Sequence, residues 1–124
     1  MIELPELVSR LDDSELTILD VRSRPEFTGE RGYASDPRRG RIPGARHLWV
    51  NELIMHSPEE IRALVGLPAG AEIVAYCHSG VRSHHAVEAL QAAGYRARNY
   101  VGSWQEWSRH EELPAETGSS EPPK

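Results

Sequence analysis

The chain contains one cysteine, Cys77, which is followed directly by the short polar segment His78-Ser79-Gly80-Val81-Arg82. A thiol can serve as a nucleophile, as a metal ligand or as half of a disulfide. One cysteine cannot form a disulfide within the chain, and the nearby His78, His84 and His85 do not reproduce a zinc-ligand spacing. The sequence therefore predicts no metal at Cys77 and favours a sulfur nucleophile.

A predicted strand and a predicted helix flank this segment. The apolar run Glu72–Tyr76 leads into Cys77, and Val81–Ala93 carries apolar residues at helical spacing. Ligands of open α/β sheets bind at the carboxyl ends of the strands. A helix N-terminus offers free N–H groups and roughly half a positive charge, both of which stabilise an anion. We therefore expect the pKa of the Cys77 thiol to lie below the roughly 8.5 of a free cysteine.

Gly80 and Arg82 fit the same interpretation. Gly80 permits a tight turn between the strand and the helix, and Arg82 adds a positive charge to the loop. The alternative is an inert Cys77 that packs as a small apolar side chain, which is a common fate of a lone cysteine. The order of strand, thiol, glycine, arginine and helix start favours the nucleophile.

The other predicted elements alternate along the chain. Strands are predicted at Leu16–Val21 and Arg96–Val101, and a weaker one near Ala45–Val50. A helix is predicted from Pro58 through Val65 with Ser57 as its N-cap, and short helices at Leu4–Leu11 and Ser103–Arg109. Strands that alternate with helices favour a parallel sheet covered on both faces.

Length and charge narrow the class of protein. The 124 residues suit one domain, and 14 basic against 19 acidic residues give a net charge of −5, which offers no bulk attraction for nucleic acid. No apolar run is long enough for a membrane span, and the N-terminus lacks the features of an export signal. We therefore expect a cytoplasmic protein that binds neither nucleic acid nor membrane.

Two segments show no periodicity. Residues 28–44 combine glycine, proline and arginine and are predicted to form a long loop. Residues 114–124 are rich in proline, serine and glutamate and are predicted to be a flexible tail. The folded domain is therefore expected to comprise residues 1–113.

Four motifs resemble those of the rhodanese-type sulfurtransferases. The segment from Cys77 to Ser83 is similar to the active-site loop of that family. The other three motifs are Leu19-Asp20-Val21-Arg22, then Gly40-Arg41-Ile42-Pro43-Gly44-Ala45 with Arg41 in place of the usual histidine, and Tyr100-Val101-Gly102-Ser103-Trp104-Gln105-Glu106-Trp107. The resemblance covers nearly the whole chain. It implies an α/β, rhodanese-like fold with a central, mostly parallel sheet of about five strands and helices on both faces.

The chain also resembles the catalytic half of tandem thiosulfate or mercaptopyruvate sulfurtransferases in residues 36–40, 102–108 and 114–118. It departs from the tandem pattern at two positions. Glu26 precedes Phe27 where an arginine often stands, and the loop ends in Val81-Arg82 rather than Val-Thr. Both departures count against mercaptopyruvate as the donor, and the preference between thiosulfate and mercaptopyruvate stays open.

The resemblance implies a double displacement that needs no metal and no organic cofactor. The Cys77 thiolate would take the outer sulfur of thiosulfate or a similar donor, and the N–H groups of residues 78–82 would hold the resulting persulfide. A thiol, cyanide or an acceptor protein would then remove this sulfur. His78 is a candidate for adjusting the preference for acceptors, with an exposed loop residue as the alternative.

Several further residues are candidates for supporting roles. Asp20, at the end of a strand, is expected to hold an arginine or loop N–H groups rather than to act as a base. Arg82 is expected to combine an inward salt bridge with contact to the donor. Trp104 and Trp107 are three residues apart and are expected to pack in the core. Candidates for anion contacts are Arg22, Arg38, Arg39, Arg41 and Arg46, with a solvated basic loop as the alternative for Arg38 and Arg39.

Two other functions are weighed against sulfur transfer to a small acceptor. A sulfur-relay protein or a regulatory binding module would act through a protein partner. A cysteine-dependent phosphatase or arsenate reductase is the weaker alternative, because phosphatase loops of this fold have one residue more between cysteine and arginine than the four found here. The shorter loop suits one sulfur atom rather than a tetrahedral phosphate.

Overall fold

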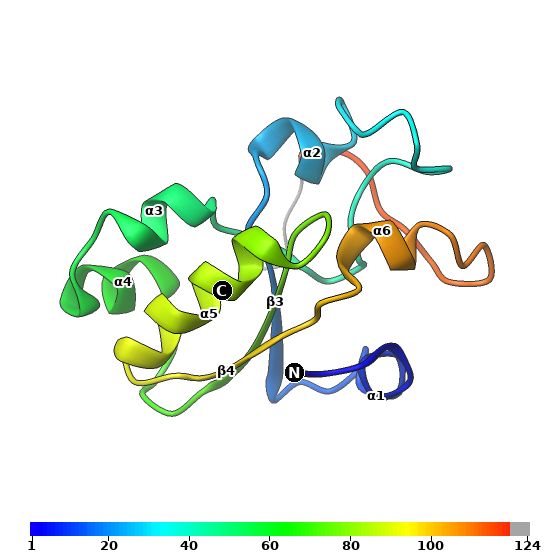
Figure 1. Cartoon of the computed structure of the whole chain (residues 1–124). Coiled ribbons are helices and arrows are strands. Elements are labelled where there is room, and N and C mark those ends of the chain that lie inside the picture. The colour runs from blue at the N-terminus through cyan, green and yellow to red at the C-terminus, as the bar shows by residue number, and fades with distance from the viewer. Residues whose placement is uncertain (120–124) are drawn as a thin grey trace.

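Four parallel strands form one sheet at the centre of the molecule (Figure 1). The computed structural model describes residues 1–119, and its strands are β1 (Leu16–Asp20), β2 (Arg46–His47), β3 (Glu72–Tyr76) and β4 (Arg96–Asn99). Their order in the sheet is β2-β1-β3-β4, and every pairing is parallel. The carboxyl ends of all four strands therefore meet at one edge, with β3 in an interior position.

Helices connect the strands and cover both faces of the sheet. They are α1 (Leu4–Ser9), α2 (Arg24–Thr28), α3 (Val50–Ile54), α4 (Pro58–Val65), α5 (Val81–Ala92) and α6 (Ser103–Trp107). The helix α4 begins with a capping box between Ser57 and Glu60, in which each side chain accepts a hydrogen bond from the other residue's backbone N–H. Figure 1 shows α3, α4 and α5 together on one side of the sheet and α1 and α6 on the other.

Side chains of β3 alternate between two apolar clusters, as the period of a strand requires. Ile73, Ala75 and Cys77 belong to the cluster that also holds buried residues of α3, α4 and α5. Val74 and Tyr76 belong to the other cluster, which includes residues of α1, α2 and α6. This alternation places the Cys77 thiol on the same face of the sheet as α5.

The α/β class and the parallel sheet are confirmed, and β3 has the predicted bounds. The number of strands differs, because the described residues form four strands rather than about five. Beyond β4, the only further parallel pairing among residues 1–119 is a single bridge between Ile2 and Tyr100. The chain leaves the sheet at once because α1 begins at Leu4 with Pro5 in its first turn, so no fifth strand develops.

Two short helices, α2 and α3, were not predicted. The sequence signal for α2 is its capping box, in which Ser23 and Glu26 occupy the N-cap and third helical positions with Pro25 between them. Between α2 and β2 the chain forms the predicted long loop without a helix or strand.

The C-terminal segment packs on that loop as far as it is described. Arg41 and Glu116 exchange backbone hydrogen bonds of 2.9 and 3.0 Å, and the N–H of Gly118 donates to the carbonyl of Thr28 at 2.9 Å. The flexibility expected for the tail stays a prediction, and residues 120–124 of that tail lie outside the described residues. Within the described part of the chain, no helix is long and apolar enough to cross a membrane.

Candidate active site

Cys77 lies at the carboxyl end of β3, directly before the loop that leads into α5 (Figure 1). Its side chain is buried, with 1% of its surface exposed. The loop turns back at Gly80, which has a φ of +93°. A Cβ atom at this position would lie 2.7 Å from the carbonyl oxygen of Val101. Only glycine combines this backbone angle with this close approach, so the tight turn predicted at Gly80 is present.

Three hydrogen-bond donors converge on the sulfur atom of Cys77. The N–H groups of Gly80 and Ser83 lie 3.1 and 3.4 Å from Sγ, and the hydroxyl of Ser83 lies 3.3 Å from it. Burial raises the pKa of the Cys77 thiol, but the hydrogen bonds from Ser83 and Gly80 outweigh burial and bring this pKa below its usual range. The site therefore stabilises a thiolate, the reactive form of cysteine.

The hydroxyl of Ser83 faces a second acceptor besides the sulfur. Its oxygen lies 2.7 Å from Oδ1 of Asn99, whose Nδ2 donates to the carbonyl of Gly80 at 3.0 Å. A serine hydroxyl carries one hydrogen, so Cys77 and Asn99 compete for it. Neither Ser83 nor Asn99 was assigned a role from the sequence. The available signal for Asn99 was its uncharged polar side chain at the end of a strand that neighbours β3.

The backbone of the loop is fixed to the start of α6. The N–H of Cys77 donates to the hydroxyl of Ser103 at 3.1 Å, and this hydroxyl donates to the carbonyl of Tyr100 at 2.8 Å. The N–H groups of Trp104 and Gln105 donate to the carbonyls of Cys77 and His78, both at 2.9 Å. These hydrogen bonds fix the backbone of residues 77 and 78, where the active-site loop begins, to the first residues of α6. Trp104 itself is buried, as expected.

Arg82 is bound to Glu26 of α2 by two hydrogen bonds, Nη1–Oε1 at 2.9 Å and Nη2–Oε2 at 3.2 Å. The Glu26 side chain is 13% exposed and that of Arg82 is 32% exposed. Burial raises the pKa of the Glu26 carboxyl, but Arg82 outweighs it and brings this pKa down to about 2. The inward salt bridge expected of Arg82 is therefore present, whereas contact with a donor stays a prediction. In the sequence, its partner Glu26 stands out only as a departure from the tandem pattern.

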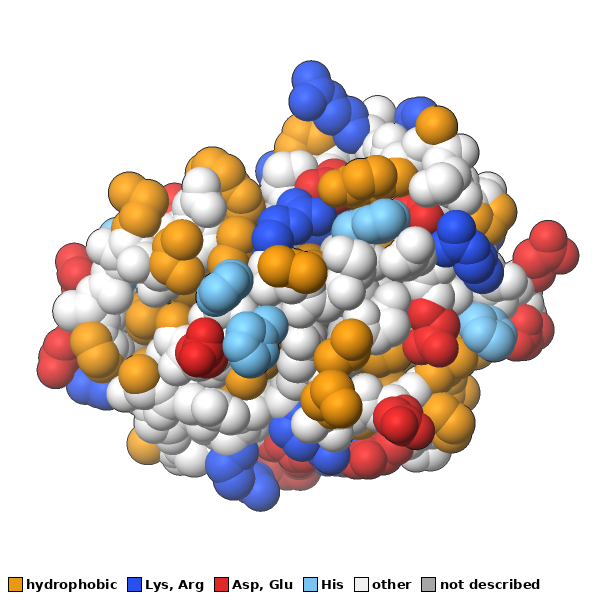
Figure 2. Space-filling view, in the orientation of Figure 1, with side chains coloured by type: hydrophobic (Ala, Val, Ile, Leu, Met, Phe, Trp, Pro, Cys, Tyr) orange, Lys and Arg blue, Asp and Glu red, His pale blue; other side chains and the backbone are white. Residues whose placement is uncertain are grey.

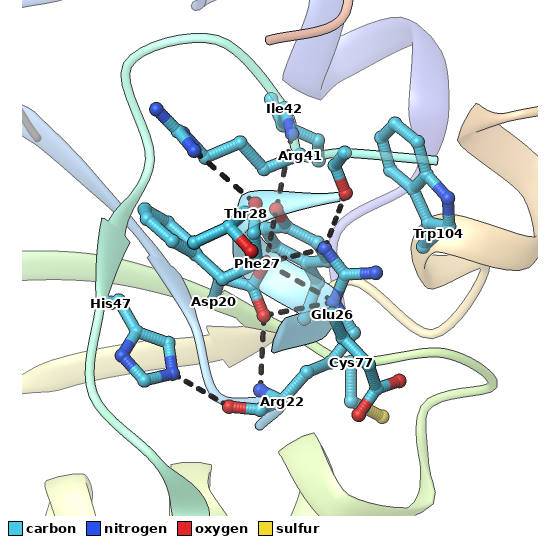
Figure 3. Close-up of polar contacts among 12 residues, drawn as sticks. Asp20, Arg22, Glu26, Phe27, Thr28, Arg41, Ile42, His47, Cys77 and Trp104 are labelled. Atoms are coloured by element: carbon cyan, nitrogen blue, oxygen red, sulfur yellow. Dashed lines mark hydrogen bonds and ion pairs between the residues drawn. The ribbon is translucent and has the colours of Figure 1, made fainter. Parts of the chain in front are cut away.

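Asp20 and Arg22 form a buried ion pair at the carboxyl end of β1, beside Tyr76 of β3 (Figure 3). The Arg22 guanidinium donates to both oxygens of Asp20, at 3.0 and 2.7 Å, and to the carbonyl of Gly40 at 2.6 Å. The hydroxyl of Tyr76 donates to Asp20 at 2.8 Å. Asp20 thus lies where a structural partner of an arginine was expected. Arg22 is 2% exposed and points into this pair, so the structure does not offer it as a contact for a soluble anion.

Arg41 lies on the far side of this ion pair from Cys77 (Figure 3). Its Nη1 donates to the carbonyls of Phe27 and Gly118, at 3.2 and 2.6 Å, and its guanidinium lies 4.1 Å from the centre of the Phe27 ring. These contacts join the long loop, α2 and the C-terminal segment. The structure therefore places Arg41 as a link between segments and does not bring it to the thiol.

The other candidate arginines also bond to backbone carbonyls. Arg38 donates to the carbonyls of Trp107, Ser108, His110 and Leu113, at 2.7 to 3.2 Å, and so closes the end of α6. Arg46 donates to the carbonyl of Val65 at 2.7 Å. Arg39 is exposed. Every residue has a backbone carbonyl, so the sequence does not show which carbonyls accept hydrogen bonds from these arginines.

His78 is held by the long loop that precedes β2. Its Nε2 lies 2.8 Å from Oδ2 of Asp36, and its ring stacks on that of Tyr33 with 3.7 Å between the centres. Arg109 approaches the other oxygen of Asp36 at 3.7 Å. The long loop therefore covers one flank of the active-site loop. A cavity of about 250 Å³ opens next to it, lined by Ser23, Glu26, Arg31, Gly32 and Tyr33.

Around the loop, hydrophobic, cationic and histidine side chains share one face of the molecule, over the start of α5 (Figure 2). Val81 and Tyr33 are 64% and 50% exposed. His84 and His85 point to solvent from α5 and are 65% and 61% exposed. Among residues 1–119, no group of three or more His, Cys, Asp or Glu side chains is arranged to hold a metal ion.

The model of the rhodanese-like domain family matches residues 3–110 of the chain. The chain belongs to the rhodanese-like family. This rhodanese-like domain is 36% identical to a Pseudomonas aeruginosa protein named probable 3-mercaptopyruvate sulfurtransferase, with 95% of this chain and 45% of that protein covered. It is 32% identical to the human thiosulfate:glutathione sulfurtransferase, with 89% and 94% covered.

A crystal structure named as that of a probable thiosulfate sulfurtransferase superposes on this rhodanese-like domain with a TM-score of 0.79 and 40% identity. The match covers 94% of this chain and 47% of the crystallised one. The chain spans about half the length, or slightly less, of the first curated relatives that it matches. The domain is thus a sulfurtransferase-family unit of the size of one half of those proteins.

Proposed function

We propose that this domain transfers a sulfane sulfur from thiosulfate or a similar donor, through a persulfide on Cys77, to a thiophilic acceptor. The observation that carries the proposal is the convergence of the Gly80 N–H, the Ser83 N–H and the Ser83 hydroxyl on the buried sulfur. The supporting relatives bear names that differ in donor and acceptor, mercaptopyruvate in one and thiosulfate with glutathione in the other. The family membership therefore supports the reaction type more strongly than any one substrate.

In the first step, the Cys77 thiolate attacks the outer sulfur of the donor. A new S–S bond forms, the old S–S bond breaks, and the electron pair of the old bond leaves with sulfite. The three donors lower the pKa of the Cys77 thiol and so favour the thiolate that makes this attack. No metal or organic cofactor is part of this proposal.

After the first step, the terminal sulfur of the persulfide carries one negative charge, which it brings from the donor, and the sulfite leaves as a dianion. The first N–H groups of a helix lack partners within that helix, and at the start of α5 those of Gly80 and Ser83 point to the Cys77 sulfur. They can stabilise the terminal sulfur as an oxyanion hole stabilises oxygen. The loop of four residues between Cys77 and Arg82 suits this single atom, which disfavours a phosphatase or arsenate reductase.

The acceptor attacks the terminal sulfur and releases the Cys77 thiolate. Because the 124 residues contain no second cysteine, the persulfide cannot resolve into a disulfide within the chain. The acceptor nucleophile is therefore supplied from outside these residues, as cyanide, as a small thiol or as a thiol of a protein. A protein acceptor would make the domain part of a sulfur relay, and the exposed Val81 and Tyr33 leave room for such a partner to approach.

The test is to incubate the protein with thiosulfate and record its intact mass before and after addition of cyanide. We expect a gain of about 32 Da, the mass of one sulfur atom, on Cys77. Cyanide should remove it and yield thiocyanate. Cys77→Ser should neither gain this mass nor form thiocyanate, whereas Ser79→Ala, which keeps the loop N–H groups, should do both. Sulfur transfer by Cys77→Ser would refute the proposed mechanism.

A further inference from the structure

The two arginines at and next to the active-site loop are each matched by a carboxylate. Arg82 is bound to Glu26, and Arg22 is bound to Asp20. The ring of His78 lies 2.8 Å from Asp36. Arg31 lies on the exposed rim of the neighbouring cavity, where water and salt screen its charge. The positive charge that the loop arginine brings to the site is therefore compensated by residues of the chain itself.

Arg82 belongs to the active-site loop, and its positive charge attracts the negative charge of the Cys77 thiolate. Burial lowers the pKa of its guanidinium, but Glu26 and, to a smaller degree, the charge on Cys77 raise it. The Glu26 carboxylate therefore neutralises the group whose field would otherwise attract an anion toward Cys77. In Figure 3 the side chains of Glu26 and Cys77 point to the same side of the Asp20–Arg22 pair.

The charge of the donor matters because the attacking group is itself an anion. When a thiolate meets a dianion such as thiosulfate, the repulsion must be offset by nearby positive charge. A donor with one negative charge meets less repulsion at the same thiolate. Backbone N–H groups help both donors, but they carry only partial charges, whereas a free guanidinium would favour the dianion specifically.

We infer that Glu26 is a specificity-determining residue: by binding Arg82 through two hydrogen bonds, it biases the site toward sulfur donors with a single negative charge, such as thiosulfonates and organic persulfides, over dianionic thiosulfate. This inference rests on the sulfur transfer proposed above. Glu26 is a positioning residue, because it acts through Arg82 and not by contact with the donor or the reacting sulfur.

Two donors with the same reacting bond test the inference. In thiosulfate, Cys77 displaces sulfite, and in methanethiosulfonate, which has a methyl group in place of one charged oxygen, it displaces methanesulfinate. Both reactions form one S–S bond and break one, and both leave the same persulfide. The quantity to measure is the ratio of kcat/KM for thiosulfate to kcat/KM for methanethiosulfonate, with cyanide as the acceptor.

Glu26→Gln should raise this ratio by about fivefold to tenfold at low salt, chiefly through a lower KM for thiosulfate. The amide oxygen can still accept hydrogen bonds from Arg82 and from the N–H of Ser23, so the fold of the loop is kept. Arg82→Gln should lower the ratio by a similar factor, because it leaves Glu26 unbalanced. The double variant should return near the wild-type ratio, and raised salt should shrink all of these differences.

Glu88→Gln is the matched control, since it removes the same charge from an exposed position on α5 and should leave the ratio unchanged. If Glu26 merely holds the loop in place, both donors will slow equally in Glu26→Gln, and the unchanged ratio will overturn the inference. If wild-type protein forms no persulfide with either donor, the proposed function itself is refuted. The two failures are therefore distinguishable.

Discussion

The hydroxyl of Ser83 is the part of the thiolate site that a single substitution isolates best. In Ser83→Ala the N–H of residue 83 and that of Gly80 still reach the Cys77 sulfur, whereas the hydroxyl's contacts with the sulfur at 3.3 Å and with Asn99 Oδ1 at 2.7 Å are removed. Ser83 is fully buried, so alanine removes one oxygen atom without exposing the site. We expect the pKa of the Cys77 thiol to rise in this variant.

The size of this rise follows from the contacts of the hydroxyl. A hydrogen bond to a charged group contributes about 1.5 to 3 kcal/mol, and about 1.4 kcal/mol corresponds to one pKa unit. The single hydrogen of Ser83 is shared with Asn99, whose Oδ1 is closer, at 2.7 Å, than the sulfur. We therefore expect the lower end of the range, a rise of about one pKa unit.

The assay is the rate of alkylation of the protein by iodoacetamide as a function of pH. Because the chain has one cysteine, intact mass reports the reaction of Cys77 alone. The midpoint of the rate profile should move up by about one pH unit in Ser83→Ala and stay in place in Ser79→Ala, which keeps every N–H of the loop. An unchanged or lower midpoint in Ser83→Ala would show that the N–H groups alone set the reactivity of the thiol.

Two further predictions concern the stability of the site. Gly80→Ala should lower the unfolding free energy more than Gly94→Ala does and should reduce sulfur transfer about tenfold or more. Both glycines have a positive φ, but only at Gly80 would a Cβ meet backbone, 2.7 Å away. Equal losses of unfolding free energy in urea would contradict this prediction. The depressed pKa of Glu26, about 2 against an ordinary 4.5, stabilises the fold above pH 4.5, and this contribution is lost as the pH falls toward 2. Between pH 7 and 3, wild-type protein should therefore lose about 1 to 2 kcal/mol more unfolding free energy than Glu26→Gln, and parallel losses would refute the role of the ion pair.

The position of Cys77, the proposed nucleophile, could be predicted from the sequence because its determinants are local. Cys77 follows a strand whose bounds are visible in the apolar run Glu72–Tyr76, and the helix that follows it is marked by its apolar spacing. A thiol between a parallel strand and a helix N-terminus has few possible environments, whatever the rest of the chain does. The donors Gly80 and Ser83 lie within the same short segment.

The partners of the loop could not be predicted because they come from distant parts of the chain. Arg82 and Glu26 are 56 positions apart, and His78 and Asp36 are 42 positions apart. Both carboxylates lie on segments without strong periodicity, a five-residue helix and a long loop, so their placement depends on tertiary packing. Arg41 illustrates the same limit, because it donates to the backbone carbonyls of Phe27 and Gly118 and any residue type could provide these acceptors.

The local residues and the distant residues of the site have different roles. The sulfur atom of Cys77 accepts hydrogen bonds from two backbone N–H groups and one hydroxyl. Many sequences with the same loop shape could supply these donors. The charge that an approaching donor meets is set by side chains outside the loop, above all by Glu26, because Arg82 alone would present a full positive charge. Under the proposed function, donor preference can therefore change through one residue of α2 while the persulfide chemistry at Cys77 is retained. The loop motif then sets the type of reaction, and the residue that binds its arginine helps to decide which donor the reaction uses.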